Sequence, residues 1–536
     1  MQNDATEMLS RLAQLKSDRS QFDVQWDDIA EYVGAAGGFS GAQKAPNQRG
    51  LKAFDSTAQI DLDRFAATMA SLMTPQNEQW HKLEVDGDED NETKVYLEDV
   101  NALLFSARYA HTSGFPGQIH EFYRALGRYG TSIMAIMDIR GIKYRNIPLR
   151  ECWIEENWQG QIDTIWREYE LTGRQAAQQF GDKLPESVAK LAAQRPGEKF
   201  TFVQKVCPNT DAAPGRKDSA GMAFASYDIC QKTKTVIDRG GYRVFPFTIG
   251  RFSSASGDVY GRSPAMQALP TIKMLNEMKK TNLRSAHRLV DPPLLLTDDQ
   301  TLGAVSLIPG ALIRGGVKDG KAQVLPLQGS GSIPTSLEIM DRERRTIHDA
   351  FFVSLFEILA DDRRNMTAQE VLHRAQEKGD LLGPISGELQ VSVFGPMIDR
   401  ELDILEMAGQ LPQIPQSIAD AGGAYKIRYT SPITRAQKAG EGIAVLRTIE
   451  AAAAIAQVDP KATNALNGPE MLRILADAQG LPAKAMRSKE EVDAMSAGQD
   501  QQAQMGQMLE GASIAADSAR SLAQAQAYSQ APGIAV

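Results

Sequence analysis

The chain has 536 residues, of which 42% are hydrophobic and 23% charged, a composition typical of a folded globular protein. No apolar run approaches the roughly 18 residues that a membrane span needs, and the first thirty residues hold no apolar segment typical of a secretion signal. These absences predict a protein without a membrane partner that stays in a cytoplasm. The net charge of -9 argues against a protein that binds DNA tightly through a basic surface, because such binding requires Lys and Arg to displace phosphate counterions. It leaves open a protein that handles DNA without gripping it, since acidic walls repel a passing duplex.

The residue types that carry catalysis or bind metals form no recognisable motif. Cys152, Cys207 and Cys230 have no C-x-x-C spacing and lie in strand-like surroundings, which predicts buried thiols rather than disulfides or a zinc site. Metalloprotease and serine-hydrolase motifs are absent, and the six histidines are scattered. We therefore expect no cofactor, no metal and a structural or conduit role rather than an enzyme.

The N-terminal quarter predicts helices followed by short strands. Apolar residues at helical spacing include Phe22, Trp26, Ile29 and Val33 in the first helix. The expected helices cover 7–33, 55–73 and about 92–130, with an extended piece beginning at Trp80 and Leu83, and the expected strands cover 132–138, 142–147, 152–155 and 162–170.

A helix is then expected over 171–195, followed by aromatic-rich strands. A stripe of aromatic side chains can stack nucleic-acid bases, but base-stacking modules interleave it with Lys and Arg on an exposed face. The pattern here favours a packed core. The expected strands cover 200–207, 223–238 and 242–252, with Phe200, Phe202, Phe224, Tyr227, Phe245 and Phe247 among their aromatics.

The most informative stretch runs from Gly257 to Pro264, where a Gly-rich turn opens a long amphipathic helix. Proline at the first helical position has a pre-set φ, and Ser263 is placed to cap the free amides ahead of it. This helix is expected over 264–290. A second long helix is expected over 335–359, so the two bracket an insertion.

Gly315 to Ala322 has the glycine and lysine spacing of a phosphate-binding loop, but Ala322 occupies the position of the Mg²⁺-binding Ser or Thr. A phosphate loop opens a helix, whereas the residues after Lys321 are typical of a strand. Asp319-Gly320 is better explained as a β-hairpin turn between strands at 311–314 and 322–327.

The C-terminal third predicts further helices. A polar loop at 361–366 precedes a helix that opens with the capping box Thr367 to Glu370 and continues to about 408, bent near Gly383-Pro384 and Gly395-Pro396. A strand over 425–429 leads to Ala-rich helices at 433–457 and 468–478. Residues 496–536 form a Gln-, Ala-, Met- and Ser-rich tract that is either weakly ordered or helical when packed against copies of itself.

The order of these elements, with particular residues, resembles the head-to-tail connector or portal proteins of short-tailed, T7-like bacteriophages. The resemblance covers most of the chain. The residues that carry it are Leu72 with Trp80 and Leu83, the Tyr260-Gly261-Arg262-Ser263 turn, Met366 to Glu370, and the run from Tyr429 to Glu441.

The resemblance implies an α+β, mainly helical portal fold that assembles into a ring, commonly of twelve subunits, at one capsid vertex. Double-stranded DNA would enter and leave through the ring, and a terminase motor, a tail adaptor, capsid and scaffold proteins would be partners in the virion and in the host cytoplasm. The implied parts are a wing (1–263 and part of 360–430), stem helices (264–290 and 335–359), a clip (291–334), a tunnel loop (361–366), a crown (431–495) and a C-terminal barrel or disordered tail (496–536).

The same resemblance assigns candidate site residues. The tunnel-loop residues would lie nearest the DNA, the stem cations would lie along the channel helices, and the clip residues would dock the motor and then the adaptor. They are Asp361, Asp362, Arg363, Arg364, Asn365 and Met366 in the tunnel loop; Lys273, Lys279, Lys280, Arg284 and Arg288 in the stem; and Arg314, Lys318, Asp319 and Lys321 in the clip.

The sequence leaves two questions open, the role of two arginines in the tunnel loop and the class of protein. Arg363 and Arg364 either act as a weak brake or sensor on DNA or only pair with Asp361 and Asp362. The chain is either a DNA conduit or a virion structural or scaffold protein that never contacts DNA. An enzyme that binds nucleotide through the Gly315 loop is the third class, and it would depend on Lys321.

Overall fold

The computed structural model describes most of the N-terminal two thirds of the chain and shorter parts of the rest. The described residues fall into two compact units, 1–88 with 93–443 and 89–92 with 444–536. The first unit mixes helices with antiparallel sheets, in agreement with the expected α+β class. Described are residues 2–34, 39, 53–85, 91–213, 216, 219–255, 257–290, 294–296, 317–318, 320–322, 324–326, 333–353, 382–415, 425–432, 444–452, 455 and 466–479.

The first two helices are confirmed as α1 (Gln2–Tyr32) and α2 (Thr57–Met73). The single helix expected over 92–130 is wrong, because the chain forms two helices there, α3 (Asn91–Arg108) and α4 (Phe115–Tyr129). Gly114 takes a left-handed conformation with φ of 71° between them. Pro116 follows in the first turn of α4, where its missing N–H removes no helical hydrogen bond.

Two antiparallel sheets form the middle of the unit. The expected strand over 223–238 is instead a hairpin, which turns before Thr235 with a left-handed φ of 51° at Lys234. The three-stranded sheet has the order β3-β2-β9, with β2 Thr131–Asp138, β3 Ile142–Ile147 and β9 Phe247–Arg251. The five-stranded sheet runs in sequence order through β4 Cys152–Glu156, β5 Ile162–Thr172, β6 Lys199–Pro208, β7 Phe224–Cys230 and β8 Thr235–Tyr242.

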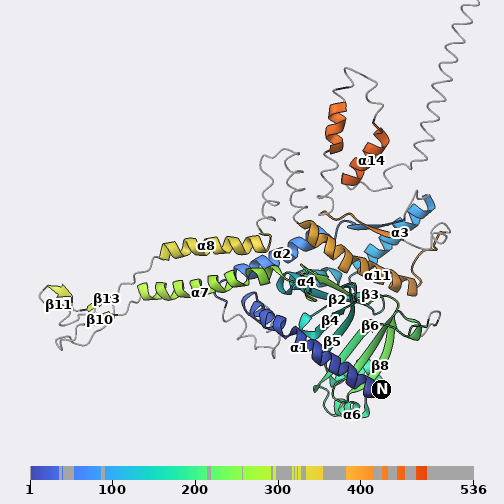
Figure 1. Cartoon of the computed structure of the whole chain (residues 1–536), viewed down its shortest axis with the longest axis horizontal. Helices are drawn as coiled ribbons and strands as arrows, with labels where there is room; N and C mark the ends of the chain where they lie inside the picture. The colour runs from blue at the N-terminus through green and yellow to red at the C-terminus, as the bar shows by residue number, and fades with distance from the viewer. Residues whose placement is uncertain are drawn as a thin grey trace, which may run out of the picture. The chain divides into compact units, whose positions relative to one another are not determined.

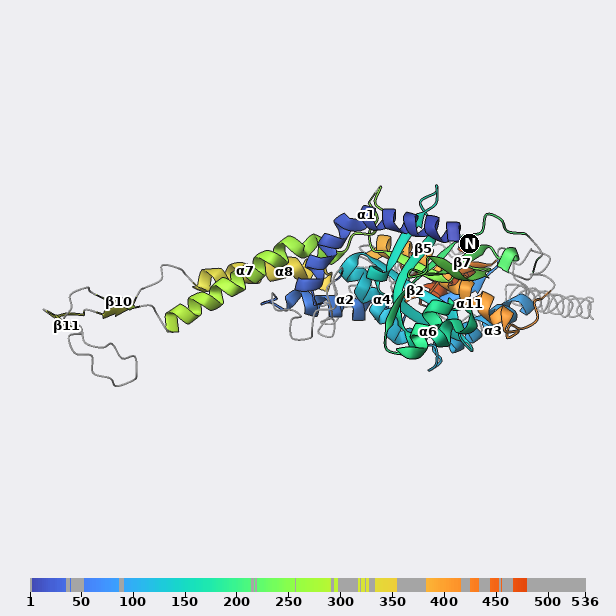
Figure 2. The ribbon, with the colours of Figure 1, turned by 90° about the horizontal axis from the view of Figure 1, so that it is seen from below.

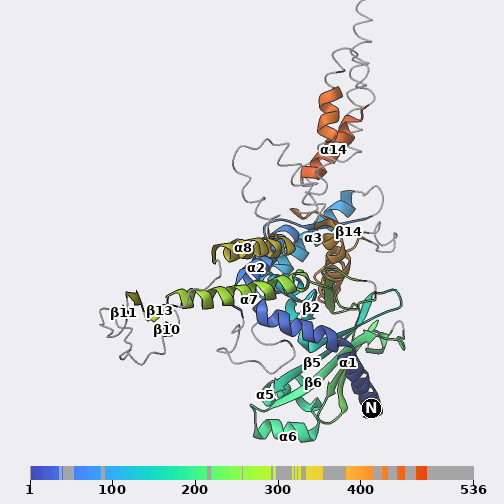
Figure 3. The ribbon, with the colours of Figure 1, turned by 60° about the vertical axis from the view of Figure 1, so that its left-hand side comes forward.

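Helices cover both faces of the five-stranded sheet (Figures 2 and 3). On one face Val203 packs with Leu12 of α1, and on the other its neighbour Phe202 packs with residues of α5 (Gly173–Phe180) and α6 (Glu186–Gln194). Successive strand residues point to opposite faces, so both faces of β6 are buried. The single helix expected over 171–195 is wrong, because the chain forms the two helices α5 and α6 there. A short turn that begins at Gly181, where φ is 52°, separates them.

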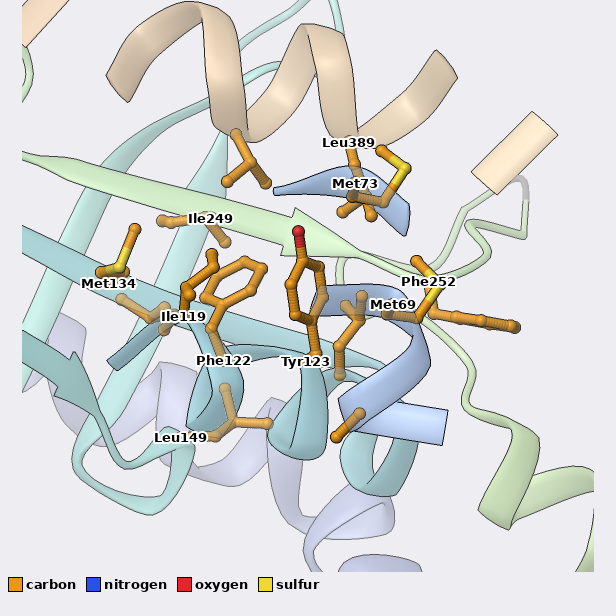
Figure 4. Packing of buried hydrophobic residues seen from close by; sticks show 14 of the residues in the cluster. Met69, Met73, Ile119, Phe122, Tyr123, Met134, Leu149, Ile249, Phe252 and Leu389 are labelled. Atoms are coloured by element: carbon orange, nitrogen blue, oxygen red, sulfur yellow. The ribbon is translucent and has the colours of Figure 1, made fainter. Parts of the chain in front are cut away.

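The main core lies between α4, α2 and the three-stranded sheet (Figure 4). Phe122 and Tyr123 of α4 are fully buried, beside Met69 of α2 and Ile249 of β9. Gly250 has no room for a side chain, since a Cβ there would lie 2.8 Å from both Phe122 and Val393. The expected packing role of the strand aromatics is confirmed by the burial of Phe200, Phe202 and Phe247.

The Tyr260 to Ser263 turn fixes the start of α7 (Pro264–Val290), which has the predicted bounds. The Ser263 Oγ accepts a hydrogen bond from the Met266 amide at 2.9 Å and donates one to the Arg128 carbonyl, which confirms the predicted cap. Gly261 lies against Gly130, whose carbonyl oxygen would be 2.3 Å from any Cβ at 261. The turn therefore joins the end of α4 to the start of α7.

The second long helix is α8 (Ile333–Ala350), which ends nine residues before the expected position 359. Phe351 and Val353 turn into the core, and Phe352 between them has a left-handed φ of 60°. A bulky aromatic residue in this conformation is strained. The helix is interrupted at Phe351 and Phe352, Val353 is again helical, and residues 354–359 of the expected helix lie outside the described residues.

Between α7 and α8 the described residues form short strands. β11 (Val317–Lys318) pairs with β12 (Lys321–Ala322), and β10 (Leu294–Leu296) pairs with β13 (Val324–Pro326). Lys318 and Lys321 are directly opposed in the register, so the turn predicted at Asp319-Gly320 is confirmed. Its predicted strands differ, because β13 pairs with β10 instead of with 311–314, which lies outside the described residues. A strand follows Lys321 instead of a helix, which removes the geometry of a phosphate loop.

The described C-terminal elements begin with a helical segment that contains a π-helical turn at Gln390–Phe394 and continues as α11 (Gly395–Met407). This turn lies at the bend expected near Gly395-Pro396, where Pro396 has no N–H to donate. The predicted strand is confirmed as β14 (Lys426–Tyr429), paired with β1 (His81–Glu84). In the second unit residues 444–452 are helical and α14 spans Gly468–Gln479, whereas the capping box at 367–370 and the tail at 496–536 lie outside the described residues.

A fully buried ion cluster of His81, Arg108, Tyr144 and Glu401 holds β1, α3, β3 and α11 together. Arg108 Nη2 donates to Glu401 Oε2 at 2.5 Å, and Arg108 Nε donates to Oε1 at 3.1 Å. Tyr144 also donates to Oε1 at 2.5 Å. Arg108 Nη1 lies 2.7 Å from His81 Nε2, and burial together with the Arg108 charge lowers the pKa of His81 well below its usual range. His81 is therefore neutral and accepts the hydrogen bond.

A second polar site lies in the five-stranded sheet, where Asp228 of β7 faces Asp238 of β8 beside a register shift. One oxygen of Asp228 is buried without a hydrogen-bond partner. Burial, reinforced by the Asp238 charge, raises the pKa of Asp228 to about 6. Ionising Asp228 is therefore less favourable in the folded chain than in the unfolded chain.

Replacing Glu401 with Gln is expected to destabilise the chain by about 3–5 kcal/mol, because it leaves the Arg108 charge buried without a counter-ion. Thermal and denaturant unfolding followed by tryptophan fluorescence would measure the change. Glu186→Gln is the matched control, since Glu186 forms an exposed pair with Lys190 and such pairs contribute about 1 kcal/mol or less. Equal effects of the two substitutions would contradict a special role for the cluster.

Asp228→Asn is expected to stabilise the chain near pH 8 and to have little effect near pH 4. The folded-state pKa of Asp228 is raised from 3.8 to about 6, so the folded chain binds the proton more tightly than the unfolded chain. The contribution of protonated Asp228 to the free energy of unfolding is therefore fully present below pH 4. It is lost as the pH rises through 6, which lowers the stability by up to about 3 kcal/mol. Unfolding curves at several pH values would measure it, with exposed Asp182→Asn as control; a stabilisation that does not vary with pH would contradict the assignment.

Candidate functional site

The long helices α7 and α8 lie side by side as an antiparallel hairpin (Figures 1 and 2). Ser336 Oγ donates to Asn282 Oδ1 at 2.9 Å, and Asn282 Nδ2 lies 3.1 Å from the Met340 sulfur. These contacts place Asn282 of α7 on the seam between the two helices.

The hairpin is buried at one end and exposed at the other. Ala265 and Leu275, in the first half of α7, are fully buried, whereas Leu289 and Val290 at its end are 63% and 88% exposed. On α8, Ile347 is buried and Leu337 is 47% exposed. The hairpin is therefore rooted in the core at the start of α7 and the end of α8, and beyond Asn282 the two helices have mainly each other as partners among the described residues.

Acidic residues of the α2 region fix the rooted end. Asp55 Oδ2 accepts a hydrogen bond from Arg344 of α8 at 3.0 Å and lies 4.0 Å from Lys279 of α7. Burial opposes ionisation of Asp55, but hydrogen bonds from Thr57 and Arg344 outweigh it and lower the pKa of this carboxyl. One carboxylate thus holds both long helices.

Two further contacts join the α2 region to the long helices. Asn276 Oδ1 accepts hydrogen bonds from the backbone amides of Phe54 and Asp55, at 2.6 and 3.1 Å. The His348 Nδ1 lies 2.7 Å from the fully buried Asp61. The α2 region is thereby joined to α7 through Asn276 and Lys279 and to α8 through Arg344 and His348.

The five predicted stem cations divide into two groups. Lys273, Lys279 and Lys280 pair within the chain, with Asp28 at 2.5 Å, Asp55 at 4.0 Å and Glu277 at 3.1 Å. Arg284 and Arg288 are exposed, and no acid among the described residues lies within salt-bridge distance of either.

Of the other candidate residues, only some lie among the residues that the structure describes. The tunnel-loop residues Asp361 to Met366 lie outside the described residues, as do Arg314 and Asp319 of the clip. Lys318 and Lys321 lie on the paired strands β11 and β12.

No group that could hold a metal ion is present among the residues that the structure describes. Cys152 and Cys230 are buried and Cys207 is partly buried, and all three thiols are free. Burial raises the pKa of Cys152 to about 12, so this thiol stays protonated. Within the described ranges, no helix is long and apolar enough to span a bilayer.

No local sequence pattern predicts the contacts that root the hairpin or the buried ion cluster. Arg108 and Glu401 are 293 positions apart, and Asp55 and Arg344 are 289 apart. Arg108, Glu401 and Arg344 lie at unremarkable helical positions and Asp55 lies just before α2, so none of them differs from the many other charged residues of the chain. Only the placement of Arg344 and His348 four residues apart on α8 could have suggested a shared face.

The comparisons with known proteins agree with this architecture. The chain is 26% identical over 534 residues to the portal protein of Salmonella phage epsilon15, a match that covers 97% of this chain and 95% of the relative. It is 27% identical over 497 residues to a probable portal protein of Bordetella phage BPP-1, covering 88% of this chain and 87% of the relative.

The family model for bacteriophage head to tail connecting proteins matches residues 5–486, which include both sheets, the α7–α8 hairpin and α14. The match therefore takes in both compact units rather than one shared domain. This chain belongs to the family of bacteriophage head to tail connecting proteins.

Proposed function

We propose that this chain is the portal subunit of a phage virion, which assembles into a ring at one capsid vertex and forms the channel for genome packaging and ejection. The family match over residues 5–486 carries the proposal. In this role the chain is a structural conduit without catalytic activity, and the motor ATPase and the tail adaptor are separate proteins that dock on it in turn.

The proposed parts follow the described elements. The sheets with α1 to α6 and α11 form the wing, α7 and α8 form the stem, and the strands between them belong to the clip that meets the motor and the adaptor. Residues 361–366 form the tunnel loop, 431–495 the crown and 496–536 a C-terminal barrel or tail.

Two physical features support a ring of identical subunits. The outer half of the α7–α8 hairpin exposes Leu283, Leu289, Leu337 and Ile339, all more than 40% exposed, and such side chains are commonly covered by a neighbour in an assembly. The hairpin is also rooted by Asp55 through both of its helices. A ring subunit needs a stem that keeps its angle to the wing, because a small error repeated around the ring prevents closure.

The mass of the purified chain in solution tests the proposal. Light scattering should give a particle of about a dozen 58.5-kDa chains, about 700 kDa, and negative-stain images of the same sample should show a ring with a central hole. A particle without a bore would favour a virion structural or scaffold protein that never contacts DNA. A monomer that also fails to form rings on a procapsid would contradict the proposal.

Replacing Arg363 and Arg364 together with Ala tests whether the tunnel loop acts on DNA. If these side chains form a positive collar around the channel, the variant should package DNA at a changed rate and retain it less well. The measurement is the packaged DNA length and its loss from filled particles over time. Unchanged packaging and retention would show that the two arginines only pair with Asp361 and Asp362.

A further inference from the structure

The second half of α7 carries several basic residues with no acidic residue among them. Between Met278 and Val290 the helix has Lys279, Lys280, Arg284 and Arg288, with His287, and no Asp or Glu. The chain as a whole has a net charge of -9, so acids outnumber bases elsewhere. A solvent-exposed helix usually mixes both signs of charge.

The neighbouring helix α8 shows that mixed pattern. It intersperses four acids, Glu338, Asp341, Glu343 and Asp349, with three arginines, Arg342, Arg344 and Arg345, and Asp341 pairs with Arg344 at 2.6 Å. The two helices of one hairpin therefore present different surfaces. Both helices expose arginines that have no acidic partner among the described residues, but only in α7 do these arginines, Arg284 and Arg288, lie in a stretch without acids.

Helix geometry places Arg284 and Arg288, the basic stripe of α7, away from α8. At 100° per residue, Arg284 and Arg288 lie about 200° and about 240° around α7 from Asn282, the residue that contacts Ser336 and Met340 of α8. The two arginines are one turn apart, about 6 Å along the helix axis. Both project from the outer half of the hairpin, where Leu289 and Val290 are exposed.

Arg284 and Arg288 lie near the C-terminal end of α7, which explains part of the clustering of basic residues there. Cations near a helix C-terminus interact favourably with the helix dipole. That interaction acts mainly within the last turn, which contains Arg288. Arg284 lies more than one turn from Val290, so the dipole accounts poorly for it.

A second copy of this chain is a poor partner for the stripe. The four acids of α8 are interspersed with three arginines, so α8 offers a neighbour little net negative charge. The acids of α1 near α7 are already engaged in their own chain, Asp28 with Lys273 and Asp23 with Arg19. A polyanion is the partner that an acid-free basic stripe fits best.

We propose that α7, rather than α8, is the stem helix that faces the DNA, and that Arg284 and Arg288 contact the phosphate backbone of the passing duplex. The inference rests on the proposed portal function. Arginine contacts with phosphates position a duplex without reading its sequence, which suits a channel that must pass every part of a genome. Two arginines per subunit in an otherwise acidic protein keep the contact weak and sensitive to salt.

A crosslinking experiment on the assembled full-length chain tests the orientation. Thr281→Cys places a thiol on the same face of α7 as Arg284 and Arg288, because the three positions are i, i+3 and i+7. Thr346→Cys is the matched control on the outward face of α8. Both threonines are exposed. Each thiol is coupled to a photoactivatable group and irradiated with a double-stranded DNA probe of mixed sequence. The unsubstituted chain with its three native cysteines gives the background.

The expected result is a DNA adduct from position 281 at least tenfold above that from position 346. In the Thr281→Cys chain, adding Arg284→Gln with Arg288→Gln should lower the yield several-fold at moderate salt, whereas Arg342→Gln with Arg345→Gln should not. Equal adducts from both positions, a larger adduct from position 346, or none from either in an intact ring would overturn the inference.

Light scattering on the same samples separates this inference from the proposed function. If the chains form rings but the adduct pattern is wrong, the inference fails and the portal proposal stands. If Arg284→Gln with Arg288→Gln abolishes ring formation while the α8 control pair does not, the stripe binds a neighbouring subunit and the inference is also overturned. If no variant and no parent chain forms a ring, the proposed function itself fails.

Discussion

The buried pair between Arg108 and Glu401 is the interaction on which the first unit depends. It joins α3 to α11 across 293 positions, and His81 and Tyr144 bring β1 and β3 to the same point. Two charges removed from water are tolerated only when their hydrogen bonds are nearly complete, which restricts these four elements to one arrangement. Since β1 also pairs with β14 and α11 continues from the π-helical turn, the same cluster ties the C-terminal part of the unit to its N-terminal helices.

The hairpin of α7 and α8 is positioned by a second set of polar contacts that do not overlap with the first. Gly130 and Gly261 set the start of α7 by close backbone approach, and Asp55 holds both helices at the rooted end. Apolar packing alone would leave such a hairpin free to tilt, because hydrophobic contacts are not directional. Directional hydrogen bonds and ion pairs define its angle, and that angle determines how subunits could close into a ring.

Local sequence signals predicted the elements that local chemistry determines. The cap at Ser263, the bounds of α7, the strand at 426–429 and the turn at Asp319-Gly320 all followed from turn and helix rules. Errors arose where a short break interrupts a longer pattern, as at Gly114, at Gly181 and after Ala350, where Phe352 has a left-handed φ. The ion cluster and the role of Asp55 could not be predicted, because pairing between distant charges leaves no periodic trace. For the candidate site, the sequence proposed five stem cations, and only the structure separated Arg284 and Arg288 from the three that already have acidic partners.

A channel for DNA must attract a polyanion enough to guide it and too little to hold it. In the proposed portal, an acidic chain with basic residues on α7 would meet both requirements, because repulsion by the surrounding acids would limit the attraction by Arg284 and Arg288. The account therefore depends on which side of the stem faces the bore. An electron cryomicroscopy reconstruction of the assembled particle would decide this most directly: the account predicts a closed ring with α7 lining a bore wide enough for a duplex and α8 outside it, whereas a ring with α8 lining the bore, or an assembly without a bore, would contradict it.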